Sequence, residues 1–192
     1  MKHLMSRIVA LAVIMTFIAG LTDSVYAGDK LSTTKTHIKF FSTTPVEDIE
    51  SNNFNSTATI DVNTGEVVFV VPMQSFEFEK SLMQRHFNQK KFLNTKDFPR
   101  ARYVATITNI EEIDFLNDGT HIAHVQGEMT IRGVTNPVQE QAEIKVANGV
   151  VAVNSVFDIV LADYGIEFTG GRPSKNVAKT VQVTVIAEFE SE

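Results

Sequence analysis

Histidine is the residue type in this chain that could most readily do chemistry. His121 and His124 stand three positions apart, a spacing that suggests a metal ligand pair. In a β-strand, however, residues three apart point to opposite faces, so these two cannot share an ion unless the strand bulges. The chain has no cysteine, and no paired carboxylates stand at ligand spacing. The sequence therefore predicts no metal site.

Motifs of known catalytic centres are also missing. There is no Gly-x-Ser-x-Gly and no glycine-rich phosphate loop, and the pair at residues 170–171 precedes no helical pattern. Acidic side chains are expected on the outward faces of strands, where nothing raises a pKa toward catalytic use. We predict no enzyme, no catalytic residue and no cofactor. An enzyme would need a histidine or carboxylate buried beside a cavity, with His121 the residue to inspect.

The elements that would position a site begin with residues 81–99, the one long stretch beyond the N-terminal region that does not alternate like a strand. Leu82, Met83 and Phe87 fall at helical spacing. Pro99 disfavours helix just before it, so the end of the stretch should be an exit loop. One helical flap in an otherwise β chain indicates a sheet with a helix laid across one end. The simpler interpretation is that the flap only plugs an ordinary core.

The N-terminus has the pattern of a signal peptide over residues 1–27. Lys2 and Arg7 supply a positive start, residues 8–21 are apolar, and residues 25–27 form a small-x-small cleavage site. We therefore expect an exported protein, periplasmic or secreted. Nothing later is apolar for long enough to cross a bilayer, so no transmembrane segment is predicted.

The composition limits the classes of partner that the chain could bind. The formal net charge is −6 and there is no basic stripe, which argues against nucleic acid and against anionic lipid surfaces. Without cysteine there are no disulfides, so the core must stabilise the fold. Residues 28–192 are long enough for a single domain with a sizeable core.

Alternation of apolar and polar residues predicts about eight strands. Asn63-Thr64-Gly65 and Asn148-Gly149 are hairpin signals. Residues 47–50 are predicted to be a loop or a short helical turn. The predicted strands are residues 37–42, 54–62, 67–71 with an extension to residue 78, 103–110, 121–132, 138–146, 150–160 and 181–189.

Eight antiparallel strands with short connections favour an all-β, eight-stranded antiparallel β-barrel, with the helical insertion between strands 3 and 4. Closing the sheet would remove its exposed edges. A two-sheet sandwich is the competing architecture.

Phenylalanine is abundant, with 14 residues, whereas tryptophan is absent. Many of these Phe residues, together with several Met residues, fall on predicted strands and on the flap. An ordinary core explains such a set. Phe and Met are also the residues that line deep, adaptable lipid pockets.

Three groups of residues resemble the motifs of the YceI-like family, in the family's order and over nearly the whole chain after the signal peptide. The opening segment, residues 37–50, resembles the family variant whose first strand runs into a Thr-Pro-x-Glu-Asp loop. The motifs are Ser81-Leu82-Met83-Gln84-Arg85-His86-Phe87-Asn88 with Phe92-Leu93-Asn94 and Phe98-Pro99-Arg100-Ala101; Gly127-Glu128-Met129-Thr130-Ile131-Arg132-Gly133-Val134-Thr135 with Pro137-Val138; and Asp163-Tyr164-Gly165-Ile166.

The resemblance implies a lipocalin-like β-barrel whose long apolar cavity holds a polyisoprenoid or another long-chain amphiphile. It also implies export, occasional homodimers and no shared catalytic centre. The function expected is sequestration or transport of such a lipid. The alternatives are an interaction barrel with a packed interior and no dedicated ligand, or a lipid-modifying enzyme.

Inward strand positions and the flap supply the predicted ligand-binding residues. Arg85, His86 and Lys90 are candidates for a polar head group at the mouth. The candidates for the lining are Phe69, Phe76, Phe78, Met83, Phe87, Phe92, Met129, Ile131, Phe157 and Val185.

Overall fold

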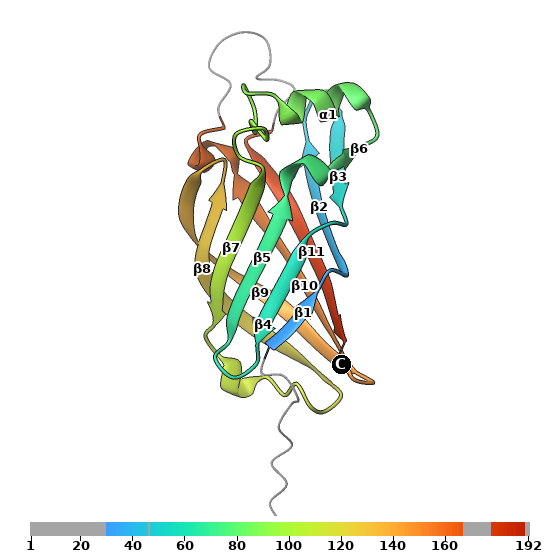
Figure 1. Ribbon diagram of the computed structural model, residues 1–192, viewed down its shortest axis with the longest axis vertical. Helices are drawn as coiled ribbons and strands as arrows, with labels where there is room; N and C mark the ends of the chain where they lie inside the picture. Colours follow the sequence, from blue (N-terminus) through green and yellow to red (C-terminus); the bar gives the residue numbers. More distant parts are fainter. Residues whose placement is uncertain (1–29, 46, 167–177, 191–192) are drawn as a thin grey trace, which may run out of the picture.

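Eleven strands of the computed structural model join into one antiparallel sheet that curls around an apolar interior (Figure 1). The structure describes residues 30–45, 47–166 and 178–190. The order across the sheet is β1-β4-β5-β7-β8-β9-β10-β11-β2-β3-β6. The strands are β1 (Lys30–Thr33), β2 (Thr36–Thr43), β3 (Asp48–Asn53), β4 (Thr57–Asp61), β5 (Glu66–Pro72), β6 (Glu77–Phe78), β7 (Arg100–Ile107), β8 (Gly119–Ile131), β9 (Val134–Ala147), β10 (Val150–Val160) and β11 (Thr180–Glu190).

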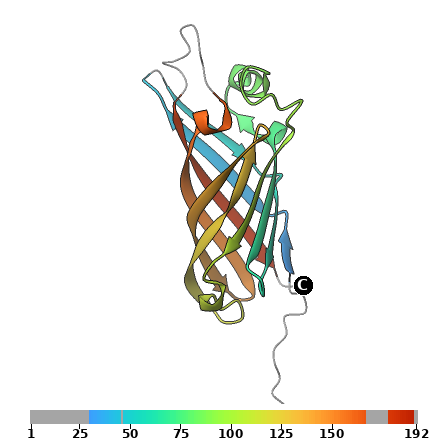
Figure 2. The same ribbon diagram turned by 90° about the vertical axis from the view of Figure 1, so that its left-hand side faces the viewer.

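Side-chain hydrogen bonds link strands close to the two edges of the curled sheet. The Thr33 hydroxyl donates to the carbonyl of Glu188 on β11 (2.6 Å). The Asn53 amide at the end of β3 donates to the carbonyl of Pro72 at the end of β5 (2.8 Å). These individual hydrogen bonds link β1 to β11 and β3 to β5. Figure 2 shows how the sheet curls round on itself.

The all-β antiparallel class is confirmed, but the eight-strand count is not what the structure has. Three short strands account for the difference. β1 and β3 were not predicted, and β6 was included in the predicted extension of β5. Residues 47–50 were predicted to be a loop or a short helical turn, but residues 48–50 begin β3. The inward positions of β3 include the buried polar side chains Ser51 and Asn53. Polar residues on the inward face conceal the alternation that would otherwise indicate a strand.

The predicted extension of β5 as far as Phe78 is also wrong. A short 3-10 helix, η1 (Met73–Ser75), follows Pro72 and ends the strand. β6 then pairs with β3, Ser51 opposite Phe78, at the far edge of the sheet. The hydroxyl of Ser51 reinforces this pairing by donating to the carbonyl of Glu77 (2.8 Å).

Two tight hairpins carry the longest strands. Arg132 and Gly133 have φ of 52° and 77° between β8 and β9, and Asn148 and Gly149 have φ of 52° and 78° between β9 and β10. Two consecutive residues with positive φ are the mark of the type I′ turn, which matches the twist of antiparallel strands. The hairpin predicted from Asn148-Gly149 is therefore confirmed.

The wall of strands is split between β9 and β10. These strands pair only from Val150 opposite Ala147 to Asn154 opposite Glu143. Beyond that point, toward the end covered by the helix, only the hydroxyl of Ser155 still bridges them, donating to the carbonyl of Gln141 (2.7 Å). β9 and β10 stay paired to β8 and β11 on their other sides. The split is thus a local opening in an otherwise continuous sheet.

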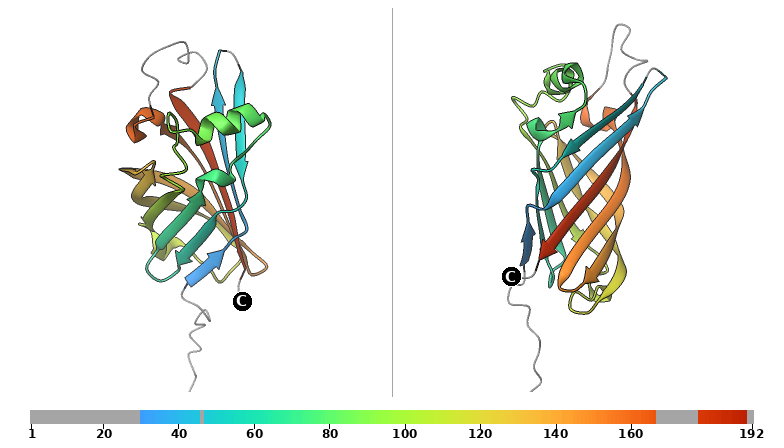
Figure 3. Two further views of the ribbon diagram at one scale, coloured as in Figure 1. Left: turned by 45° about the horizontal axis from the view of Figure 1, so that its top comes forward. Right: turned by 90° about the vertical axis from the view of Figure 1, so that its right-hand side faces the viewer.

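The predicted helix is present as α1 (Ser81–Asn88), which lies across one end of the curled sheet (Figures 1 and 3). The helix was predicted between strands 3 and 4, but it lies between β6 and β7. The number differs because β1, β3 and β6, which precede the helix, were not predicted as separate strands. The side chain of Gln84 donates to the carbonyl of Phe76 (2.8 Å), and the buried hydroxyl of Thr95 donates to the side chain of Asn88 (2.6 Å). These bonds tie α1 to the segment before it and to the loop after it. The flap is defined here as residues 81–99.

Two further 3-10 helices, η2 (Ile110–Glu112) and η3 (Leu161–Tyr164), lie at opposite ends of the sheet. After η2, Ile113 and Phe115 are buried at the end away from α1. Of the helices that the structure describes, none is long and apolar enough to cross a membrane.

Candidate functional site

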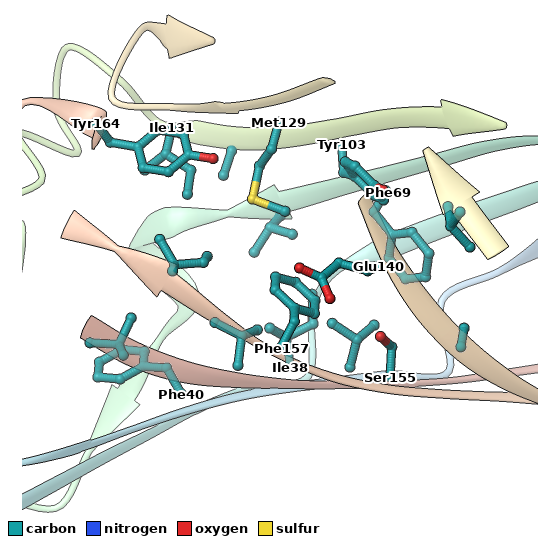
Figure 4. A pocket seen from close by; sticks show the side chains of 18 of the residues that line it. Ile38, Phe40, Phe69, Tyr103, Met129, Ile131, Glu140, Ser155, Phe157 and Tyr164 are labelled. Atoms are coloured by element: carbon teal, nitrogen blue, oxygen red, sulfur yellow. The ribbon is translucent and has the colours of Figure 1, made fainter. Parts of the chain in front are cut away.

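A cavity of about 200 Å³ occupies the interior of the curled sheet (Figure 4). Its wall is built from β2, β4, β5, β7, β8, β9, β10 and β11, with α1 and the loop after it covering one end. Period-two alternation explains the apolar lining: on β8, for example, Ala123, Val125, Met129 and Ile131 all face inward. The interior is therefore hollow rather than packed end to end.

Phe87 on α1 closes the covered end of the cavity. Its side chain is 7% exposed. Its ring centroid lies 5.7 Å from that of Phe40, 5.5 Å from Phe76, 5.1 Å from Phe78 and 6.0 Å from Phe92. Ring pairs at such distances add attraction beyond simple burial of area. The flap therefore ends the cavity with an aromatic cluster rather than with a polar mouth.

Most of the predicted lining residues lie on the cavity wall. Phe78 stands behind Phe87 and does not line the cavity, and Met83 is half-buried on α1 away from it. The predicted residues on the wall are Phe69, Phe76, Phe87, Phe92, Met129, Ile131, Phe157 and Val185.

The three residues predicted for a head group are not brought to the cavity. Arg85, His86 and Lys90 are all exposed on α1 and just beyond it. Residues one or two apart on a helix do not share a face. Arg85 and His86 therefore face solvent, while Phe87 faces the interior. Any part they play in ligand binding is confined to the outer surface of the flap.

Glu140 on β9 is a wall residue that the sequence reasoning missed. The expectation that acidic residues all lie on outward faces is wrong at this position, because Glu140 shares its face with Val138, Ala142 and Ile144. Its carboxyl projects into the cavity beside Phe157 (Figure 4). Burial, followed by repulsion from Asp158, raises the pKa of Glu140 above its usual value. The alternation of apolar residues along β9 was a signal that could have identified it.

Three more polar side chains line the cavity. The Ser155 hydroxyl is already used, since it donates to the carbonyl of Gln141. Tyr164 is hydrogen-bonded to the side chain of Asn136. The hydroxyl of Tyr103 is buried and has no protein hydrogen-bond partner among the described residues. Burial, with the nearby Glu140 and Tyr164 acting in the same direction, raises the pKa of Tyr103 to about 12.

The histidines do not form a site. His121 and His124 point to opposite faces of β8: His124 is exposed, and His121 is half-buried near η2 without lining the cavity. The ring nitrogen Nε2 of His121 is buried without a partner in the part of the chain that the structure describes. Within that same part, no group of three or more His, Asp or Glu residues could hold a metal ion.

Comparison with protein-family models matches residues 29–189 to the YceI-like domain. The chain belongs to the YceI-like family. A comparison with curated protein sequences finds no match. The family motifs meet in the structure: Phe98, at the end of the flap, lies against Gly133 in the turn between β8 and β9. Tyr164, from the third motif, lies on the cavity wall.

Several solved structures share this fold. A polyisoprenoid binding domain from Saccharophagus degradans, implicated in plant cell wall breakdown, is 14% identical, with a TM-score of 0.69 over 85% of this chain and 98% of that chain. BcnA of Burkholderia cenocepacia is 16% identical, with a TM-score of 0.66 over 80% and 96%. The YceI protein of Campylobacter jejuni is 17% identical, with a TM-score of 0.60 over 79% and 90%. At these identities the likeness shows the fold.

Proposed function

We propose that this YceI-like protein binds a long-chain amphiphile of the polyisoprenoid type, with the apolar chain in the cavity, and carries or stores it outside the cytoplasm. The observation that carries the proposal is the hollow, almost wholly apolar interior. A solved structure of the same fold is that of a polyisoprenoid binding domain, which supports the class of ligand. The protein acts as a binding protein, not as an enzyme.

The apolar wall supplies enough free energy for such a ligand. Each methylene moved from water into the cavity gains about 0.8 kcal/mol, so about ten of them gain about 8 kcal/mol. That figure corresponds to roughly micromolar affinity before the cost of ordering the ligand is subtracted. Longer buried chains bind more tightly, as far as the cavity can accommodate them.

The size of the cavity sets a condition on long chains. Small-molecule pockets usually measure about 300–1,000 Å³, whereas this one measures about 200 Å³. A full polyisoprenoid must therefore displace lining side chains or leave part of its length outside. Met73 and Met129 line the cavity, and their unbranched, flexible side chains can adapt to a guest more easily than branched ones.

Export follows from the signal-peptide pattern of residues 1–27, which lie outside the described residues. An exported carrier suits a ligand that is nearly insoluble in water. Fractionation of the native host, with N-terminal sequencing of the mature protein, tests this part. A start at Gly28 in the extracytoplasmic fraction supports export, and an intact N-terminus in the cytoplasm contradicts it.

The two alternatives make different demands on the interior. An interaction barrel without a ligand would have a packed core, which the cavity argues against. A lipid-modifying enzyme would need a reactive pair at the cavity. Glu140 is a carboxyl in the right place, but the hydroxyl of Ser155 is held by Gln141 and no histidine is among the described residues that line the cavity.

Organic extraction of the protein purified from its native host tests the function. We expect mass spectrometry of the extract to show a long-chain amphiphile, and added polyprenols to raise the thermal unfolding temperature. If the extract holds no such lipid and polyprenols cause no thermal shift, the carrier function is wrong.

A further inference from the structure

The polar groups inside the cavity indicate what kind of ligand end it accepts. Of the four polar side chains on the wall, Ser155 and Tyr164 are held by Gln141 and Asn136. The hydroxyl of Tyr103 is buried without a partner, and the carboxyl of Glu140 has no hydrogen-bonded or ion-paired side chain within the described residues. Leaving a buried hydroxyl unpaired costs free energy, so such groups in a cavity point to a ligand that pairs with them.

The split in the wall explains how the fold tolerates the carboxyl of Glu140 in an apolar cavity. It does not explain why the hydroxyl of Tyr103 is buried without a partner. β9 and β10 stop pairing at Glu143 and Asn154, so Glu140 lies just beyond the end of the ladder. One side of Glu140 borders an outer depression that includes His124 and Gln141. The carboxyl can therefore reach water through the wall. The phenol of Tyr103, on β7, has no such route, because its oxygen is buried.

The charge of the wall excludes one class of ligand end. Among the described residues that line the cavity there is no Lys, Arg or His, and the one carboxylic acid is Glu140. The exposed Arg85 and Lys90 lie on the outer surface of the flap. A phosphate or diphosphate inside the cavity would lose its hydration and face an acid with no cation to compensate.

We propose that the cavity recognises a neutral, hydroxyl-bearing end of the amphiphile, held between the carboxyl of Glu140 and the phenol of Tyr103, and that it rejects a phosphorylated end. This proposal rests on the lipid-binding function above. A hydroxyl is the simplest group that can accept from Tyr103 and donate to Glu140 at once. An ester can only accept, and a hydrocarbon can do neither.

Burial keeps the proton on the phenol of Tyr103, which can therefore donate to a ligand at neutral pH. It raises the pKa of Glu140 and raises the pKa of Tyr103 to about 12. With the hydroxyl at Glu140, the chain of the ligand runs past Met129 and Phe157 toward Phe40, whose ring stacks on Phe87 (Figure 4). The alcohol end is then the inner end, and the flap covers the chain.

Three ligands with one chain test the proposal on the wild-type protein: geranylgeraniol, its acetate and its phosphate, each displacing a fluorescent apolar probe. We expect the alcohol to bind about tenfold more tightly than the acetate and the phosphate, because a site built to pair a hydroxyl disfavours analogues that lack it. A phosphate that binds as tightly as the alcohol overturns the proposal, while binding of all three alike leaves the lipid-binding function standing.

Two conservative variants identify the groups responsible. Glu140→Gln and Tyr103→Phe should each reduce the preference for the alcohol over the acetate to about threefold or less. Glu143→Gln, exposed on the other face of β9, should leave the preference unchanged. An unchanged preference in both cavity variants overturns the assignment. If none of the three ligands binds and host extraction yields no lipid, the lipid-binding function and this inference fail together.

Discussion

Phe98, at the end of the flap, packs against Gly133, in the turn between β8 and β9, so closely that a Cβ on Gly133 would lie 2.6 Å from Cε1 of Phe98. Gly133 also has a φ of 77°, which side chains other than glycine rarely adopt. This contact sets the exit of the flap on the end of the longest hairpin. The position of the cover over the cavity therefore depends on a residue with no side chain.

Gly133→Ala should destabilise the protein for two reasons. The positive φ costs about 1–2 kcal/mol for alanine, and the collision with Phe98 adds about 1–3 kcal/mol. Gly165→Ala is the matched control, since Gly165 has a φ of 64° but its nearest atom, Nη1 of Arg132, lies at 3.5 Å. Urea unfolding measures both variants. Equal losses in the two would show that Phe98 does not constrain Gly133.

A Phe98→Ala background isolates the contact further. Once the ring is removed, Gly133→Ala should cost only what its backbone strain costs, so the two substitutions should be coupled by the collision energy of about 1–3 kcal/mol. Additive effects of the two substitutions would mean that the flap does not rest on this turn.

Thr95→Val tests the hydrogen bond that ties the flap to its own exit loop. The Thr95 side chain is 1% exposed and its hydroxyl donates to Asn88 at 2.6 Å. Valine keeps the shape but leaves the half-buried Asn88 oxygen without its donor, so we expect a loss of about 1–3 kcal/mol in the free energy of unfolding. Thr106→Val, at an exposed strand position, should change it by less than about 0.5 kcal/mol. Similar effects of both variants would contradict the anchor.

Phe87→Ala tests the aromatic closure. Removing a ring that contacts four other phenylalanines should cost about 3–5 kcal/mol. Leu82→Ala on the same helix, where the side chain is 53% exposed, should change the free energy of unfolding by less than about 0.5 kcal/mol. Chemical denaturation compares the two. A small loss at Phe87 would mean that α1 is only loosely attached to the sheet.

The shifted pKa of Glu140 predicts a dependence of stability on pH. Because the folded chain holds this proton more tightly than the unfolded chain, Glu140 lowers stability as the pH rises from its unfolded value of about 4.5 through its raised folded pKa. Asp158 adds to the shift, while Tyr103, with a pKa of about 12, stays neutral over this range.

Comparison with Glu140→Gln isolates this effect, since other titrating groups are common to both proteins. The wild type should lose stability relative to the variant over the range from about pH 4.5 to neutral pH in urea unfolding experiments. A difference between the two proteins that stays constant across this range would show that the carboxyl is solvated as in the unfolded chain.

The sequence predicted the long elements of the fold well. β8, β10 and β11 alternate cleanly, and α1 is marked by helical spacing, so each could be placed within a few residues. β3 and β6 escaped because their pairing depends on polar residues such as Ser51 and on contacts distant in the chain. No local sequence pattern indicates such pairing residues or such distant contacts.

Alternation also made part of the cavity wall predictable. Phe157 and Met129 followed from alternation. Phe78 shares the parity of Phe76, but it packs against Phe40 and Phe87 in the aromatic cluster and does not line the cavity. Glu140 was missed because its charge was given more weight than its place in the alternation of β9. Its role depends on the split between β9 and β10, which only the structure reveals.

A tryptophan reporter tests the central claim most directly, because the chain has no tryptophan of its own. Phe157→Trp places the reporter on the cavity wall, and Phe54→Trp places it on the surface, where the side chain is 54% exposed. A long-chain alcohol brominated along its chain quenches tryptophan on contact. We predict saturable quenching of the Phe157→Trp protein at one ligand per chain, with the Phe54→Trp protein unaffected. Quenching of neither protein, or of both equally, would contradict a lipid-binding cavity.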